Sequence, residues 1–449
     1  MDGGWVEGVS TDTRKGCSGA LFVALEGSEH DGHEFLEEAA DRGAAAVMVA
    51  SSKLQIAVQA LPEGMPVFDV PDPLVGLQRL ASSYRDLVNP EVVAVTGSNG
   101  KTGTKDMIRD VLSSSFKVHA TAGNLNNHIG LPLTILGMDE DVKVLVAEMG
   151  ANHKKEILQL ARIARPRIGV ITNIGPGHLE FFGSLKGVAA AKSELLEAIG
   201  PNGTAVLPAD DRFLEFLKQK TKGRVVTFGY SEGADWRVEN DEMLDNSGYR
   251  FEIGGTRIEL KRRGRFNILN AAASFAVGSL LGVPADTMSG VLASSRAAEG
   301  RGVLFDVGGI LIMDDSYNSN PASLAAALEA FMEMGIDGRR WLVLGDMLEL
   351  GGEAIRLHRE AGENCGKAGV DGIVTLGDLT VELNRAAAEQ RKAPPDISHF
   401  MDAANLASYL NGFLEPGDAV LVKGSRGMRM EKFIEELEKL RDMRKRRID

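Results

Sequence analysis

The segment with the most recognisable chemistry in this chain is a glycine-rich loop that ends in a lysine and a threonine. It reads Thr96-Gly97-Ser98-Asn99-Gly100-Lys101-Thr102-Gly103 and lies between a β-branched apolar run and a helix-like run. In such a loop, backbone N–H groups and the helix dipole point at a phosphate that the glycines allow to come close. The lysine reaches the β- and γ-phosphates, and the threonine hydroxyl holds Mg²⁺. The usual loop is longer, since Val95 stands where its first glycine would be, but this loop still predicts a bound nucleotide.

Three further side chains with catalytic chemistry lie downstream of this loop. Glu148 directly follows an apolar run at residues 144–147. At the carboxyl end of a strand it suits Mg²⁺ better than it suits a helix cap. His178 follows the apolar run at 168–171, and a metal ligand and a solvated loop histidine fit it equally well. Lys192 lies among small helical residues, where by itself it is interpreted as a surface lysine.

Polar clusters with binding chemistry follow other predicted elements. The amides of Asn126 and Asn127 suit peptide or sugar recognition, and they suit ordinary turns equally well. Asp315 and Asn318 follow an apolar run and precede a proline. Their segment therefore either caps a helix or holds a ribose.

Two segments near the ends of the chain suit anions. Residues 423–427 carry two cations in a glycine-containing loop that suits a carboxylate or a phosphate, and residues 10–14 have the same character. The last helix-like segment, 431–449, ends in the basic run Arg444-Lys445-Arg446-Arg447. We interpret that run as a solvated helix end whose cations complement the helix dipole.

The composition indicates a globular protein of several domains. The 449 residues are 44% hydrophobic and 25% charged, and they carry a net charge of −13. That charge argues against nucleic acid or an anionic membrane as the main partner. Two cysteines far apart in sequence, Cys17 and Cys365, do not indicate a disulfide framework. Without an apolar run of membrane-spanning length or a signal peptide at residues 1–5, we expect a cytoplasmic protein.

Alternating strand-like and helix-like runs predict an α/β protein of three domains. Residues 1–88 predict a small N-terminal α/β domain, residues 89–301 a central P-loop-type domain with a mostly parallel sheet, and residues 302–449 a C-terminal Rossmann-like doubly wound domain. The main predicted strands are 21–25, 44–49, 92–95, 144–147, 168–171, 310–313, 341–344, 373–376 and 419–422, with antiparallel strands around 227–260. The main predicted helices are 34–42, one that begins at Pro73, 267–281 and the charged tail from 431.

Taken in order, these segments resemble the ATP-dependent Mur ligases of bacterial cell-wall synthesis, and the resemblance covers nearly the whole chain. Its most specific segments are 96–102, 124–134, 147–153, 172–184, 314–321 and 344–351. The resemblance implies an ADP-forming amide ligase that works through an acyl phosphate. Three segments further imply UDP-N-acetylmuramoyl-tripeptide and D-alanyl-D-alanine as the substrates: the Asn-rich segment, Glu-Met-Gly-Ala-Asn and Asp-Ser-Tyr-Asn. The protein is expected to act as a monomer.

The resemblance also assigns roles to individual residues. As implied catalytic groups it gives Lys101, Lys192, His178 and Arg301, and it reverses the surface interpretation of Lys192, which would be carbamylated. The implied ATP-binding residues are Thr96, Gly97, Ser98, Asn99, Gly100, Lys101, Thr102, Gly103, Asn267, Asn270, Arg301, Asp315 and Asn318. At two implied magnesium sites the ligands are Thr102, Glu148, His178 and Lys192. The implied substrate contacts are Thr13 and Arg14 for UDP, Asn126 and Asn127 for the sugar peptide, and Asp346, Lys423, Ser425 and Arg426 for the dipeptide.

The chain departs from the pattern of this family at a few positions. Phe266 stands where histidine is frequent, and Phe181 and Ser193 stand where glycine is frequent. The family has further residues before the UDP motif, so the first domain is expected to lack an opening strand or helix. A sister ligase that adds a single amino acid, a folylpolyglutamate synthase-like ligase and a nucleotide-binding regulator without ligase activity remain alternatives.

Overall fold

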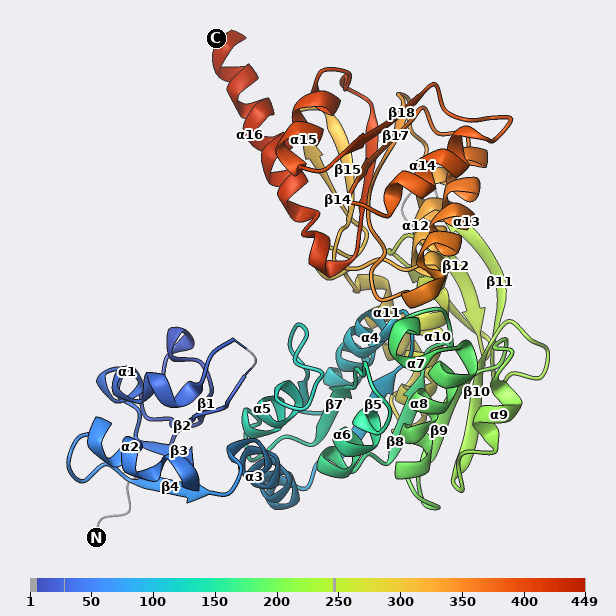
Figure 1. Ribbon diagram of the computed structural model, residues 1–449. Coiled ribbons are helices and arrows are strands. Elements are labelled where there is room, and N and C mark those ends of the chain that lie inside the picture. The colour runs from blue at the N-terminus through green and yellow to red at the C-terminus, as the bar shows by residue number, and fades with distance from the viewer. Residues whose placement is uncertain (1–5, 28, 245–247, 449) are drawn as a thin grey trace.

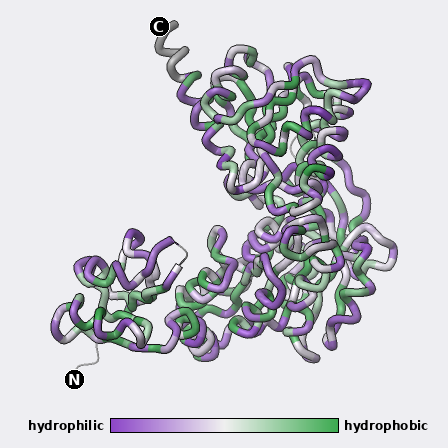
Figure 2. The backbone as a smooth tube through the Cα atoms, viewed as in Figure 1, coloured by the Kyte–Doolittle hydropathy of each residue, from purple (hydrophilic) through white to green (hydrophobic). Residues whose placement is uncertain are grey.

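Three β-sheets organise the chain in this computed structural model, which describes residues 6–27, 29–244 and 248–448, without the side chains of 442–448 (Figure 1). The sheet nearest the N-terminus stands apart at lower left, while the other two meet through helices and a β-ribbon. Figure 2 shows hydrophobic segments running through the interior of each unit and hydrophilic segments on the loops. Three α/β domains were predicted, and this fold class is confirmed. Across these described ranges, no helix is long and apolar enough to cross a membrane.

The N-terminal sheet is parallel throughout, in the order β1-β2-β3-β4. Its central strands β2 and β3 are buried, whereas the edge strands β1 and β4 are half-buried or exposed, and Phe22, Leu36 and Val47 lie in its core. The strands are β1 (Val9–Ser10), β2 (Leu21–Val23), β3 (Ala46–Ala50) and β4 (Val67–Val70). The helices are η1 (Thr13–Lys15), η2 (Gly32–Phe35), α1 (Leu36–Asp41), η3 (Ser51–Lys53) and α2 (Leu54–Ala60).

Helix α3 (Pro73–Val88) joins this domain to the central one. It begins as predicted, with the Asp72 side chain accepting hydrogen bonds from two backbone N–H groups and proline in the first turn. Gln78 donates a hydrogen bond to the carbonyl of His128 (3.0 Å), and Tyr84 donates one to the carbonyl of Met138 (2.7 Å). The helix is therefore anchored on the central domain by polar contacts as well as by packing.

The central sheet has the order β13-β12-β11-β10-β9-β8-β5-β7-β6. Its strands are β5 (Glu91–Thr96), β6 (Val118–Ala120), β7 (Val144–Glu148), β8 (Ile168–Ile171), β9 (Thr204–Pro208), β10 (Arg224–Gly229), β11 (Trp236–Leu244), β12 (Gly248–Ile253) and β13 (Thr256–Leu260). The helices are α4 (Lys101–Ser113), α5 (Gly130–Leu136), α6 (Glu156–Ala164), α7 (Leu179–Phe182), α8 (Leu185–Ala198), α9 (Leu214–Lys218), α10 (Phe266–Leu280) and α11 (Ala285–Ser294).

Antiparallel pairing was predicted across residues 227–260, and this is wrong for the first strand of that region. β10 pairs in parallel with both β9 and β11, and antiparallel pairing begins only between β11 and β12. The side chain of Asp235 accepts hydrogen bonds from the backbone N–H and the hydroxyl of Thr227, both at 2.8 Å. The chain therefore returns alongside β10 before β11 begins. Alternating polarity indicates a half-buried strand but carries no information on its direction.

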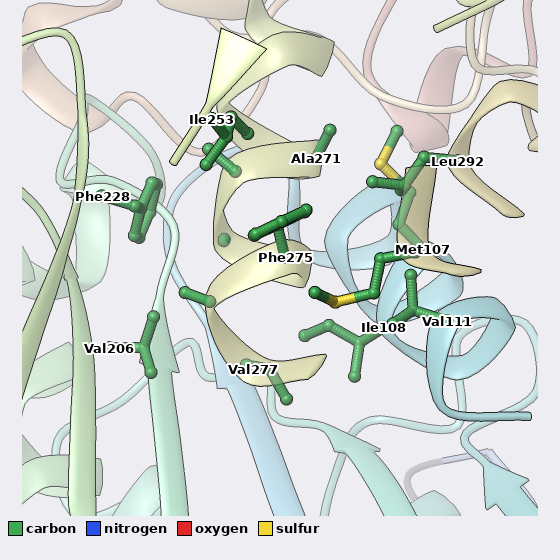
Figure 3. Close-up of a cluster of buried hydrophobic side chains, with 14 of the residues drawn as sticks. Met107, Ile108, Val111, Val206, Phe228, Ile253, Ala271, Phe275, Val277 and Leu292 are labelled. Carbon is green, nitrogen blue, oxygen red and sulfur yellow. The ribbon is translucent and has the colours of Figure 1, made fainter. Parts of the chain in front are cut away.

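Helices α4 and α10 pack side by side on one face of the central sheet (Figure 3). Met107, Ile108 and Val111 of α4 and Ala271 and Phe275 of α10 belong to one core cluster and are almost completely buried. Removing each large apolar side chain from water stabilises the fold by about 1.5–3 kcal/mol. This packing holds the beginning of α10 beside the glycine-rich loop that precedes α4.

The C-terminal sheet has the order β14-β15-β19-β16-β17-β18, with only the β14–β15 pair antiparallel. Its strands are β14 (Val303–Val307), β15 (Ile310–Asp315), β16 (Arg340–Gly345), β17 (Gly372–Leu376), β18 (Asp396–Phe400) and β19 (Ala419–Lys423). The helices are α12 (Pro321–Met332), η4 (Gly351–Glu353), α13 (Ala354–Lys367), α14 (Thr380–Ala388), α15 (Ala403–Asn411), η5 (Arg426–Met428) and α16 (Glu431–Ile448).

Two strands at the edges of this sheet, β14 and β18, were not predicted. Both are largely half-buried, and β18 carries Asp396, Ser398 and His399 instead of an apolar run. An edge strand packs fewer side chains into the core, so its sequence shows a weaker hydrophobic signal. The predicted terminal helix is present as α16, while the side chains of the basic run Arg444-Lys445-Arg446-Arg447 lie outside the described residues.

Candidate active site

A cavity of about 730 Å³ lies where the central and C-terminal domains meet. The carboxyl ends of several parallel strands open toward it, as is usual for ligand sites in α/β folds. Its lining from the central domain includes residues 98–104, Asn126, Asn127, Glu148, His178, Asn267 and Asn270. From the domain junction and the C-terminal domain it includes Arg301, Asp315, Tyr317, Asn318, Asn320 and Lys423. Most of the residues predicted to bind ATP therefore share one cavity.

The glycine-rich loop is folded as a cradle between β5 and α4. Gly100 has φ +77°, and a Cβ atom there would lie 2.6 Å from Oδ1 of Asn270, so this position requires glycine. Nζ of Lys101 donates hydrogen bonds to the carbonyls of Gly97 (2.8 Å) and Ser98 (3.1 Å). Burial lowers the pKa of Lys101. The ammonium group therefore folds back over the space that the loop encloses, where a phosphate would meet it.

Glu148, at the end of β7, faces the hydroxyl that follows this lysine. Thr102 donates a hydrogen bond from Oγ1 to Oε2 of Glu148 (2.8 Å), and Asn126 donates one from Nδ2 to Oε1 (2.8 Å). Glu148 is 2% exposed. Carboxylate and hydroxyl oxygens are ligands that Mg²⁺ prefers, with phosphates and water completing its shell. Among the described residues, no group of three or more His, Cys, Asp or Glu side chains is placed to hold a metal ion.

Lys192 is buried in α8 and is 1% exposed, which overturns its interpretation from the local sequence as a surface lysine. The small residues around it pack closely because α8 lies against α6. Its Nζ lies 5.8 Å from the centre of the Phe182 ring. Burial, assisted by the nearby charge of Lys101, lowers its pKa to about 7. A substantial fraction of this amine is therefore uncharged at neutral pH.

His178 lies directly before α7 and meets the C-terminal domain. Its Nδ1 lies 2.5 Å from Oε2 of Glu349, and this contact lowers the pKa of the Glu349 carboxyl. Sequence reasoning missed Glu349, although it lies in the 344–351 segment that supports the resemblance. Glu349 lies between Leu348 and Leu350, and this local sequence does not indicate a partner in another domain.

The asparagines expected beside adenine are buried next to the glycine-rich loop and are linked by consecutive side-chain hydrogen bonds. Thr104 donates a hydrogen bond from Oγ1 to Oδ1 of Asn270 (3.1 Å), and Asn270 donates one from Nδ2 to Oδ1 of Asn267 (3.2 Å). Phe266 also lines the cavity and is 41% exposed, so an apolar ring is available there to a planar ligand. These positions agree with a site for the base and sugar end of a nucleotide.

The C-terminal side of the cavity contributes both positively and negatively charged side chains. The guanidinium of Arg301 lies over the ring of Tyr317, 4.0 Å from its centre. Nζ of Lys423 lies 2.5 Å from Oδ2 of Asp315 and donates a hydrogen bond to the carbonyl of Asn318 (2.9 Å). Burial raises the pKa of Asp315, against the opposing effect of the Lys423 charge. Lys423 therefore has a carboxylate partner inside the protein.

An amide pair that sequence reasoning missed crosses between the domains at the loop. Asn320 donates a hydrogen bond from Nδ2 to Oδ1 of Asn99 (2.7 Å), and it also caps α12 by accepting from the N–H of Ser323. A helix cap was one of two interpretations of this segment, the other being a ribose contact, and local sequence does not indicate the contact with Asn99. Asn99 thus touches both the phosphate cradle and the C-terminal domain.

Several residues with implied substrate roles have other partners. Thr13 and Arg14 lie in η1 of the N-terminal domain and do not line the cavity, and Arg14 pairs with Asp12 at 2.9 Å. Oδ1 of Asn127 accepts a hydrogen bond from the N–H of Gly130 (2.8 Å), the first residue of α5. Arg426 is exposed and pairs with Glu431 at 3.1 Å. Their contacts to substrate stay predictions.

Asp346 and Ser425 are buried and bonded within the C-terminal domain. Oδ1 of Asp346 accepts hydrogen bonds from the N–H groups of Leu379 (3.0 Å) and Thr380 (2.8 Å) at the start of α14. Ser425 donates a hydrogen bond from Oγ to the carbonyl of Ser319 (3.1 Å). Both side chains therefore have a structural role, and neither lines the cavity.

The helix cap predicts a measurable cost of removing Asp346. In Asp346→Ala the N–H of Leu379 and the buried N–H of Thr380 would lose their acceptor, so we expect the free energy of unfolding to fall by about 1–2 kcal/mol. Urea unfolding followed by circular dichroism measures the change. Asp378→Ala, which removes an exposed carboxylate just before α14, serves as the matched control and should unfold like the wild type. Equal stability of the two variants would contradict the capping role.

Comparison with known proteins shows similarity in sequence along nearly the whole chain. The chain matches, in order, the Mur ligase family catalytic domain (residues 6–85), the Mur ligase middle domain (95–278) and the Mur ligase glutamate ligase domain (300–426). It is 36% identical over 435 residues to the UDP-N-acetylmuramoyl-tripeptide--D-alanyl-D-alanine ligase of Bacillus subtilis, covering 96% of this chain and 93% of the relative. The protein of that name from Escherichia coli is 35% identical over 446 residues, with 96% and 94% covered.

A solved structure shows the same arrangement of the chain. The crystal structure of MurF ligase from Thermotoga maritima in complex with ADP superposes with a TM-score of 0.85 at 29% sequence identity. The alignment covers 99% of this chain and 100% of that one. The likeness therefore extends through all three domains and is not confined to the phosphate loop.

Proposed function

The chain belongs to the Mur ligase family, and from that premise we propose that it joins D-alanyl-D-alanine to UDP-N-acetylmuramoyl-tripeptide at the expense of ATP. The observation that carries this proposal is the full-length identity to relatives with that activity in their names. The cavity supports it, because Lys101, Glu148 and Arg301 from different segments all line it beside the glycine-rich loop. The product would be the pentapeptide precursor of peptidoglycan.

The proposed chemistry proceeds in two transfers. A carboxylate oxygen of the tripeptide attacks the γ-phosphorus of ATP, the bond to the β-phosphate oxygen breaks, and ADP leaves with its electron pair. The amine of the dipeptide then attacks the acyl carbon of the resulting acyl phosphate. The tetrahedral intermediate loses a proton from nitrogen and expels phosphate, which leaves the amide. The protein's task is mainly to position the reactants and neutralise their charge.

Chain residues can be assigned to these tasks. Lys101 would leave the carbonyls of its own loop and bind the β- and γ-phosphates, and Arg301 would approach the γ-phosphate from the domain junction. Asn267, Asn270, Asp315 and Asn318 would hold the adenosine end. Thr102 would hold one magnesium ion, and Glu148 and His178 would hold a second, with a carbamylated Lys192 as a further proposed ligand. Both ions would neutralise phosphate charge.

The proposed ligand role of Lys192 needs a change of its charge. An uncharged amine attacks carbon dioxide, a new N–C bond forms, and one proton is released to give a carbamate. The lowered pKa of Lys192 supplies the uncharged amine at neutral pH. The product ends in a carboxylate, which a cation attracts, whereas the original ammonium repels one.

The substrate would reach this cavity from the N-terminal domain. We assign the UDP end to Thr13 and Arg14, the peptide to Asn126 and Asn127, and the dipeptide to the region of Asp346, Lys423, Ser425 and Arg426. Because the N-terminal sheet stands apart in Figure 1, the three sites must be brought together by domain movement or spanned by the substrate. We further propose a cytoplasmic monomer, which size-exclusion chromatography tests for the oligomeric state.

The proposal predicts phosphate release that requires both peptide substrates. With ATP and Mg²⁺ present, we expect release to reach its full rate only when UDP-N-acetylmuramoyl-tripeptide and D-alanyl-D-alanine are added together. Single amino acids and folates serve as alternative substrates, since a sister ligase or a folylpolyglutamate synthase-like enzyme would prefer them. ATP binding without any substrate-dependent release would indicate a regulator and contradict the ligase.

A further inference from the structure

Glu349 of the C-terminal domain lies against a histidine at the edge of the central domain's cavity. Nδ1 of His178 is 2.5 Å from Oε2 of Glu349. His178 lines the cavity, whereas Glu349 lies in the loop between β16 and η4 and is not part of its lining. The carboxylate thus approaches the ring from outside the cavity. It contacts Nδ1 and does not contact the other ring nitrogen, Nε2.

The backbone around this contact is closely fitted. The N–H of Glu180 donates a hydrogen bond to the carbonyl of Glu349 (3.1 Å). A Cβ atom at Gly351, which has φ +57°, would lie 2.9 Å from Cα of Glu180. Leu179 packs against the core of the C-terminal domain. The two side chains therefore meet at an interface between domains that the backbone itself holds in place.

Both partners have an uncommon backbone conformation. His178 has φ 54° and Glu349 has φ 62°, in the left-handed region that residues with a side chain seldom occupy. Such conformations persist where the surrounding structure imposes them, and they cluster at functional sites. Here the imposed conformations place the imidazole and the carboxylate against each other.

We propose that Glu349 is a positioning residue that accepts the Nδ1–H of His178 and so presents Nε2 to a metal ion in the cavity. The inference rests on the proposed function, in which His178 is a magnesium ligand. A histidine that binds a metal usually donates its other ring N–H to a carboxylate or carbonyl, which fixes the tautomer and the ring orientation. Since Glu349 belongs to the C-terminal domain, docking of that domain completes the metal site. By linkage, docking and metal binding strengthen each other.

Binding of Mn²⁺ tests this role without turnover. We would titrate the full-length protein with Mn²⁺ in the presence of a non-hydrolysable ATP analogue and follow free Mn²⁺ by electron paramagnetic resonance. Glu349→Ala should weaken the His178-dependent site by about 10–100-fold. Glu349→Gln should retain most of the affinity, because its amide oxygen can still accept the Nδ1–H. Glu353→Ala is the matched control, since Glu353 lies in neighbouring η4 and pairs with Arg356 instead.

A double-mutant cycle separates positioning from a merely structural effect. If Glu349 acts through His178, the double variant His178→Ala/Glu349→Ala should bind Mn²⁺ as weakly as His178→Ala alone. Wild-type affinity in Glu349→Ala, or additive losses in the double variant, would overturn the inference while leaving the proposed function intact. A wild type that binds the analogue without Mn²⁺ would contradict the proposed metal chemistry and the inference together.

Discussion

Replacing Lys101 by alanine is expected to lower the rate of ADP formation by about 10³-fold or more while the chain stays folded. The loss follows from the absence of a positive charge where negative charge shifts between the transferred phosphate and the leaving ADP. The fold should survive because the Lys101 ammonium bonds only to two carbonyls of its own loop among the described contacts. A coupled assay of ADP with all three substrates measures the rate.

The control for this variant is a lysine of the same domain outside the cavity. Lys143→Ala removes an exposed side chain just before β7 and should retain wild-type turnover. Thermal unfolding of Lys101→Ala should match that of the wild type within a few degrees, which would separate a catalytic loss from misfolding. Near-normal turnover in Lys101→Ala would refute the proposed phosphoryl transfer.

Replacing Lys192 by methionine is expected to lower turnover and raise stability together. Turnover should fall by about 10²–10³-fold, because the proposed carbamate disappears. The free energy of unfolding at pH 6 should rise by about 1–3 kcal/mol, because methionine fills the same space without a buried charge. Lys186→Met alters an exposed position on the same helix and should change neither quantity.

The pH dependence of this stabilisation has a definite sign. The pKa of Lys192 falls from 10.5 when unfolded to about 7 in the folded chain. Between these values the unfolded chain binds more protons, so the contribution of Lys192 to stability rises with pH. The advantage of Lys192→Met over the wild type is therefore largest below pH 7 and shrinks as the pH rises toward 10.5. Thermal unfolding at pH 6 and pH 9, in buffer depleted of carbon dioxide so that Lys192 is a free amine, measures the difference. Equal differences at the two pH values would contradict a buried amine with a lowered pKa.

Carbon dioxide provides a second readout on the same residue. If Lys192 is carbamylated, wild-type activity should fall in buffer depleted of carbon dioxide and return when bicarbonate is added. Lys192→Met should respond to neither treatment. If wild-type activity does not change with bicarbonate over hours, the Lys192 amine is not carbamylated, and its proposed role as a metal ligand is contradicted.

Local sequence predicted the elements around the proposed phosphate site because their signals are short-range. The run that became β5 is apolar and β-branched, the loop after it is rich in glycine, and the helix expected after the loop is α4. Buried parallel strands read as continuous apolar runs, so β7, β8 and β19 were also recognised. Where burial is partial the signal weakens, and the edge strands β14 and β18 were missed for that reason.

The partners of individual side chains were beyond local sequence. Asp346 was assigned to substrate by resemblance, and that role stays a prediction. In the fold its carboxylate accepts hydrogen bonds at the start of α14, which lies far along the chain. The partner of Asn320 was also not predictable from local sequence, since its amide donates a hydrogen bond to Asn99 of the central domain. In both cases the side chain's chemistry was recognisable, while its partner depended on how distant segments pack.

By itself the sequence determined the fold class, the phosphate-binding loop and, through the order of its motifs, the family. These follow from residue type and spacing along a single segment, which persist however the segments later pack. Only the tertiary structure decided that Lys192 is buried with a lowered pKa and that His178 meets Glu349. Burial and electrostatic shifts are sums over neighbours from several elements, and the His178–Glu349 contact exists only where the central and C-terminal domains meet.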